Sequence, residues 1–162
     1  MVNARKTLVN WIGLLGVVSF IFYAAAVIIT PLAYPGYDWM SRAVSDLMAD
    51  NAPSRALWTQ LSSLDTGPAL VCVTMVCVVV SGKLNRTLRL GIYACAAMVW
   101  VSMIGYSAFP LSAIGTGLAP GGYFGLFQRF SNMIAVNGFI ATLGIYLFLG
   151  KFDHNLDRGV SA

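Results

Sequence analysis

The stretch LVNWIGLLGVVSFIFYAAAVIITPL, residues 8–32, decides the fold. It contains no charged residue and follows the basic pair Arg5 and Lys6. A helix needs about 20 apolar residues to cross a bilayer, whereas the apolar core of a signal peptide has about 7–15. We therefore predict a retained transmembrane helix over 8–32 that ends at Pro31 and Pro35.

Three further apolar runs are long enough to cross a bilayer, and they cover about 57–80, 90–109 and 130–149. The predicted fold is all-α: one polytopic membrane domain, residues 1–162, with four transmembrane helices. The second run contains Pro68, so two versions of it stay open. We favour one continuous helix bent at Pro68. The alternative is an interfacial helix over 53–64, after which Asp65 caps the span and Pro68 lies in the first turn.

The connections between these runs are more polar. Residues 38–50 have helical spacing, with Trp39 and Leu47 on one face and Arg42 and Asp46 on the other. We predict a short helix there that lies in the membrane interface. A second connection, 111–127, is rich in Gly and Ser and is predicted to be a loop, and a polar tail covers 151–162.

The composition excludes a water-soluble domain. Hydrophobic residues make up 58% of the chain and charged residues 10%, whereas soluble domains have roughly 25% charged residues. The mean hydropathy is +0.75. The net charge of +4 does not indicate nucleic-acid binding, because the basic residues lie between apolar runs and form no single stripe with aromatic residues. The expected partner is the lipid bilayer.

The distribution of basic residues predicts the orientation. With four spans, one side of the membrane holds seven basic residues: Arg5, Lys6, Lys83, Arg86, Arg89, Lys151 and Arg158. The other side holds three: Arg42, Arg55 and Arg129. Basic residues in short loops stay on the cytoplasmic side. We therefore predict a multi-pass protein of the plasma or inner membrane, with both termini cytoplasmic.

Five polar residues are candidates for a site near the outer face: Arg42, Asp46, Asp65, Gln128 and Arg129. Asp65 stands out, because an ionisable group in or near a span is costly and often functional. It could serve as an interfacial cap or as the ion-pair partner of Arg42, Arg55 or Arg129. It could also bind a proton or a cation. Asn132 and Asn137 are expected to bond to neighbouring helices, and Gly91, Ala94, Cys95 and Ala97 would permit close helix packing.

Cofactor sites are sparse in the sequence. His154 is the only histidine, so a haem held by two histidines of one chain is excluded. No metal site and no cofactor are predicted, although a bound lipid or pigment would be compatible with the sequence. Cys72, Cys77 and Cys95 lie inside apolar runs and are interpreted as packing residues.

Two blocks of sequence carry a family resemblance. The first contains Tyr34-Pro35-Gly36-Tyr37, Ser45-Asp46-Leu47, Asn51-Ala52-Pro53-Ser54-Arg55, Leu57-Trp58 and Gln60-Leu61-Ser62-Ser63-Leu64. The second contains Gly105-Tyr106, Phe109-Pro110-Leu111-Ser112 and Phe127-Gln128. Over roughly residues 34–130 the chain resembles the multi-span membrane family called domain of unknown function 998. The resemblance implies a membrane topology with an important outer face, and no activity.

The chain departs from this family in two ways. Family members have about six spans rather than four. They also have an acid and then a Met-His pair after the Phe-Gln motif, where this chain has Arg129-Phe130-Ser131-Asn132. A role for that histidine therefore cannot be transferred.

Three functions are compatible with these patterns. The first is an accessory or structural subunit that packs against lipid or against a larger membrane protein complex. The second is a small-molecule or ion-binding or transport protein with Asp65 and Arg129 near its site. The third is an intramembrane enzyme that uses Asp46 and Asp65 as an acid–base pair.

Overall fold

The computed structural model describes residues 6–108 and 123–154. Within these residues every secondary-structure element is a helix and no strand is present, which confirms the all-α prediction. Three helical segments are long and apolar enough to cross a membrane: Leu8–Ala33, Arg55–Val80 and Gln128–Phe148. The chain therefore has the character of a membrane protein.

The first predicted helix, 8–32, is confirmed within one residue at its C-terminal end. It consists of α1 (Leu8–Ile12), α2 (Leu14–Ile29) and the 3₁₀ turn η1 (Thr30–Ala33). Gly13 joins α1 to α2 in a right-handed helical conformation, with φ −56° and ψ −32°. The three pieces therefore form one rod.

The second span is continuous through its proline. The helix α3 (Arg55–Val80) has Pro68 in its interior. The alternative with a separate interfacial helix and Asp65 as a cap is therefore wrong, because Asp65 lies inside α3. A proline has no N–H, so the Leu64 carbonyl loses its helical donor there.

The helix α4 (Arg86–Ala108) begins four residues before the predicted start of the third span. The side chain of Asn85 explains the early start, since its Oδ1 accepts a hydrogen bond of 2.9 Å from the backbone N–H of Leu88. The helix has 23 residues. Over the described residues it is not among the segments that are both long and apolar enough to cross a membrane. The predicted last residue, 109, lies outside the described residues.

The fourth helical rod starts earlier than predicted. It contains α5 (Phe124–Phe130), the π-helical η3 (Ser131–Gly138) and α6 (Phe139–Phe148). The loop prediction is thus wrong for residues 124–127, and residues 111–122 lie outside the described part. Beyond the rod, Gly150 adopts a positive φ of 68° and a short helix α7 (Lys151–His154) follows.

The predicted interfacial helix over 38–50 is largely wrong. Only a 3₁₀ helix, η2 (Val44–Met48), forms there, and residues 39–42 are turns and bends. The proposed shared face is also wrong, because Leu47 is fully buried whereas Trp39 is 38% exposed. As described below, side chains bind the backbone carbonyls that a regular helix would have used.

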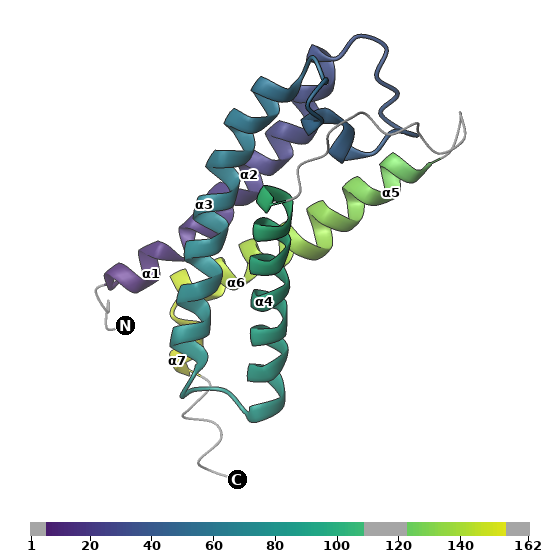
Figure 1. Cartoon of the computed structure of the whole chain (residues 1–162). Coiled ribbons are helices and arrows are strands. Elements are labelled where there is room, and N and C mark those ends of the chain that lie inside the picture. Colours follow the sequence, from purple (N-terminus) through teal and green to yellow (C-terminus); the bar gives the residue numbers. More distant parts are fainter. Residues whose placement is uncertain (1–5, 109–122, 155–162) are drawn as a thin grey trace.

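Figure 1 shows how the rods are arranged. α2 and α3 run antiparallel, α4 lies beside α3, and the α5–η3–α6 rod crosses α2. α1, α7 and the turn between α3 and α4 lie at one end of the bundle. The connection from α2 to α3 and the start of α5 lie at the other end.

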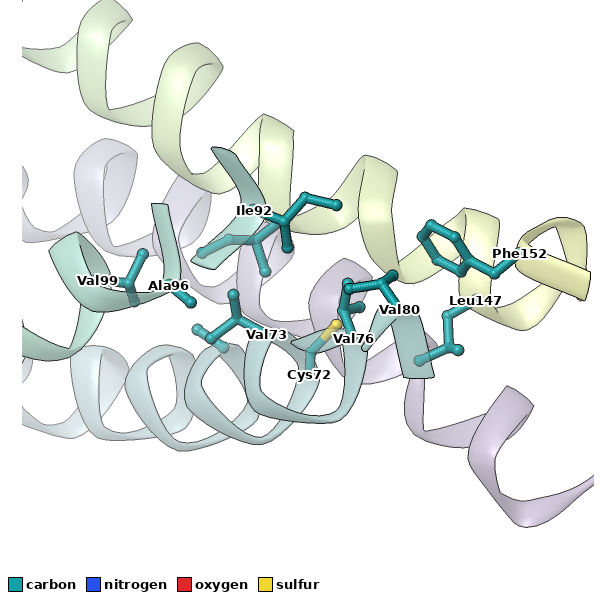
Figure 2. Packing of buried hydrophobic residues seen from close by; sticks show 11 residues of the cluster. Cys72, Val73, Val76, Val80, Ile92, Ala96, Val99, Leu147 and Phe152 are labelled. Atoms are coloured by element: carbon teal, nitrogen blue, oxygen red, sulfur yellow. The ribbon is translucent and has the colours of Figure 1, made fainter. Parts of the chain in front are cut away.

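The main core lies between α3, α4 and α6, and Figure 2 shows its side chains. Cys72, Val73, Val76 and Val80 line one face of α3. They pack against residues of α4, α6 and α7: Ile92, Ala96, Val99, Ile140, Leu147 and Phe152. Between helices in lipid, close van der Waals packing holds such a core, since lipid tails are as apolar as the side chains.

The tightest helix contact is made by glycines that the sequence analysis did not single out. A Cβ at Gly13 would clash with the carbonyl oxygen of Gly144, and a Cβ at Gly144 would clash with that of Gly13. One turn further along α2, a Cβ at Gly16 would lie 2.8 Å from the carbonyl oxygen of Ile140. The backbones of the first and fourth rods therefore touch, which only glycine allows.

Candidate functional site

Residues 34–54, which lead from η1 to α3, form a cap at one end of the bundle that is bonded to α5. The backbone N–H of Leu126 donates to the carbonyl of Met40 over 3.0 Å. The side chain of Gln128 accepts a hydrogen bond of 2.8 Å from the backbone N–H of Val44. A Cβ at Gly125 would clash with the carbonyl of Arg42, so glycine is required for this close approach.

Arg129 is the centre of the cap, and it is only 2% exposed. Its Nη1 donates to the carbonyls of Trp39, over 2.6 Å, and of Arg42, over 3.2 Å. Its Nη2 donates to the phenol oxygen of Tyr37 over 2.6 Å. The guanidinium also lies 4.8 Å from the centroid of the Trp39 ring, within the range of a cation–π interaction. The two Nη atoms thus meet dipoles and the guanidinium meets aromatic faces, whereas the buried Nε has no hydrogen-bond partner among the described residues.

Tyr37 links Arg129 to the backbone of the cap. Its phenol donates to the carbonyl of Ala43 over 2.6 Å. Burial raises the pKa of Tyr37, an effect that nearby Asp46 adds to and that Arg129 and Arg42 oppose. The phenol therefore stays neutral at physiological pH and keeps the proton that it donates to Ala43.

The other cap residues support the same turn. The guanidinium of Arg42 donates to the Tyr34 phenol over 3.1 Å and lies 5.7 Å from the ring centroid. Asp38 accepts hydrogen bonds from the Ser41 hydroxyl and from the backbone N–H of Met40. The bond from Ser41 lowers the pKa of Asp38, so its carboxylate is ionised at neutral pH.

These contacts explain why no regular helix forms over 38–43. The carbonyls of Trp39, Arg42 and Ala43 bind side chains of Arg129 and Tyr37, and the Asp38 side chain takes a backbone N–H of its own turn. Such side-chain bonds compete with helical backbone bonds. The structure places Arg42, Gln128 and Arg129 together in the cap, as the sequence predicts.

Asp46 is 4% exposed, and it lies in η2 among the buried residues Val44 and Leu47. The carbonyl of Leu47 accepts a hydrogen bond of 3.0 Å from the Ser54 hydroxyl, so η2 lies level with the start of α3. Asp65 is eleven residues after Ser54, which corresponds to about 16 Å along the axis of α3. The two carboxyl groups therefore lie at different depths, which does not favour the acid–base pair.

Asp65 has a partner that the sequence analysis missed. It is 6% exposed, and its Oδ1 accepts a hydrogen bond of 2.6 Å from the hydroxyl of Ser19, which is fully buried in α2. Neither Arg42 nor Arg129 forms an ion pair with it, since both guanidinium groups are bound within the cap. Arg55 instead pairs with Asp50 over 2.8 Å at the exposed surface. Ser19 was recognisable as the one small hydroxyl residue in the apolar run 14–29.

Comparisons with known proteins do not identify the chain: no protein-family model matches it, and neither a curated protein nor a solved structure is significantly similar to it. The resemblance to the domain of unknown function 998 family is therefore neither supported nor contradicted. Among the described residues, no group of three or more His, Cys, Asp or Glu side chains could hold a metal ion. The function must be argued from the cap, from Asp65 and from the outer faces of the helices.

Proposed function

We propose that the protein is a four-span membrane protein of the plasma or inner membrane that serves as an accessory or structural subunit of a larger membrane assembly. In this topology α4 is the third of the four spans, and both termini are cytoplasmic. The observation that carries the proposal is the outer face of α4.

One face of α4 packs against other described residues of the chain, and the opposite face meets none of them. Ile92, Ala96 and Val99 are buried against α3. Gly91 and Ala94, on the other side, are exposed, and a Cβ at Gly91 would meet nothing within 4 Å. Small residues on a membrane helix let a second helix approach closely. We infer that a helix of a partner protein covers this face.

The cap supports the same role. Its polar groups bind one another: Arg129 to two carbonyls and a phenol, Gln128 to a backbone N–H. Such a network favours a fixed surface, because buried polar groups hold their partners strongly at low dielectric. A fixed outer surface suits assembly with a partner.

The test is to introduce large side chains on the exposed face of α4 that carries Gly91 and Ala94. Gly91→Leu combined with Ala94→Leu should abolish co-purification with a partner in a fixed ratio, measured by native mass spectrometry of complexes extracted into lipid nanodiscs. The thermal stability of the isolated chain should not change, since both positions are exposed.

The matched control is Val78→Leu, at an α3 position that is 62% exposed, and it should leave the complex intact. A wild-type chain that is extracted only as a single copy without a partner would contradict the proposal. So would a double variant that still binds its partner in the wild-type ratio.

A further inference from the structure

Asp65 is a buried acid in the interior of the bundle, away from the polar cap. It lies ten residues from the start of α3, or about 15 Å along the helix. Its hydrogen bond from Ser19 ties it to α2, and both side chains are at least nine-tenths buried. The role of an accessory subunit does not use this pair.

The charge of an ionised Asp65 would need compensation. Over residues 6–108 and 123–154, the hydrogen bond to the Asp65 carboxyl comes from Ser19, and no basic side chain forms an ion pair with that carboxyl. Moving an isolated carboxylate into a medium of low dielectric costs far more free energy than one hydroxyl donor offsets. A carboxyl group in this position is therefore neutralised, either by a proton or by a bound cation.

The helix across from Asp65 supplies a second observation. The glycine contacts set the antiparallel register of the first and fourth rods: Gly13 is opposite Gly144, and Gly16 is opposite Ile140. The π-helical η3 packs against α2. Asn137 is three residues before Ile140 in the fourth rod, as Ser19 is three residues after Gly16 in α2, and Asn137 is 7% exposed.

The backbone is irregular at this level. Asn137 belongs to the π-helix η3, and its Nδ2 donates to the carbonyl of Asn132 over 3.2 Å. With the amide nitrogen engaged, Asn137 has its Oδ1 as an acceptor, which is a ligand atom for hard cations. π-helical segments are rare and are frequently found at functional sites.

We propose that Asp65, Ser19 and Asn137 form an intramembrane site for a single positive charge, either a proton or a small monovalent cation such as Na⁺. In the proton form Asp65 is a neutral acid, hydrogen-bonded to Ser19. In the cation form the carboxylate, the Ser19 hydroxyl and the Asn137 amide oxygen are the ligands. This site is independent of the partner face on α4.

Infrared spectroscopy and cation titration of the purified chain in nanodiscs test the two forms. A carboxylic-acid C=O band at neutral pH that disappears in Asp65→Asn supports the proton form. A thermal stabilisation by NaCl over choline chloride at equal ionic strength, absent in Asp65→Asn, supports the cation form. Asp50→Asn is the matched control and should change neither readout, since Asp50 is an exposed acid paired with Arg55.

Ser19→Ala keeps the test decisive if Asp65→Asn does not fold. It removes one hydrogen bond, so it should shift the acid band to higher frequency or weaken Na⁺ binding by about tenfold. The proposal is overturned if wild-type Asp65 shows only carboxylate bands and no response to Na⁺. It is equally overturned if the acid band or the Na⁺ effect persists unchanged in both Asp65→Asn and Ser19→Ala. Neither result would affect the association test of α4.

Discussion

At the scale of single residues, the guanidinium of Arg129 distributes its hydrogen bonds among the carbonyls of Trp39 and Arg42 and the phenol of Tyr37. This arrangement depends on a planar fork with several N–H donors in fixed directions. A lysine has the same charge, but its ammonium group is a compact point charge on a flexible stem. Arg129 is therefore needed for its geometry as well as for its charge.

We predict that Arg129→Lys destabilises the protein by about 2–4 kcal/mol, because one or two buried acceptors lose their charged donor. The loss is measured as a decrease in the free energy of unfolding in detergent. Arg55→Lys is the matched control and should change it by less than about 0.5 kcal/mol, since the pair with Asp50 is exposed. Equal losses in the two variants would show that the cap does not depend on the guanidinium.

At the scale of secondary-structure elements, two sets of small residues have different roles. The sequence analysis singled out Gly91 and its neighbours in α4, which the described part of the chain leaves uncovered. The glycines that hold two rods together within the chain are Gly13, Gly16 and Gly144. Glycine spacing alone cannot distinguish these roles, because it says nothing about which helix lies opposite.

We predict that Gly144→Ala separates the first and fourth rods and lowers the free energy of unfolding by about 2 kcal/mol or more, since its Cβ would enter the space of the Gly13 carbonyl. Gly67→Ala is the control, because a Cβ there meets nothing within 4 Å. That variant should be neutral or stabilising by up to about 1 kcal/mol, as alanine favours helices. Thermal unfolding of both variants in the same detergent gives the comparison, and a stable Gly144→Ala would contradict the close contact.

At the scale of the whole molecule, the two ends of the bundle hold different segments of the chain. α1, α7 and the α3–α4 turn lie at one end, and the cap lies at the other (Figure 1). The turn and its flanks hold Lys83, Arg86 and Arg89, the basic cluster that the positive-inside rule assigns to the cytoplasm.

We predict that a membrane-impermeant maleimide added to intact cells labels Ala56→Cys, at the exposed start of α3, and does not label Gly82→Cys in the turn. After the cells are opened, both should react. The unmodified chain, with Cys72, Cys77 and Cys95, is the control for background labelling. Labelling of Gly82→Cys alone from outside would show that the protein has the opposite orientation in the membrane. Labelling of both positions from outside would exclude the four-span topology.

The sequence by itself determined the helical class and nearly all of the first span. Long apolar runs such as 8–32 and 57–80 have one stable form in lipid, where each backbone N–H and C=O must be bonded within its own segment. The pair of Asp50 with Arg55 is equally local, because the two residues are five apart at the start of α3. These features depend on local composition, which a sequence displays directly.

Only the tertiary structure decided the contents of the cap and the partner of Asp65. A 3₁₀ turn replaces the predicted helix over 38–50 because Arg129, about 90 positions away, takes the carbonyls of Trp39 and Arg42. Asp65 meets Ser19 rather than an arginine because α2 packs against α3 along its whole buried face. Hydrogen bonds between distant segments depend on how the helices pack, and a linear pattern of residues does not specify that packing.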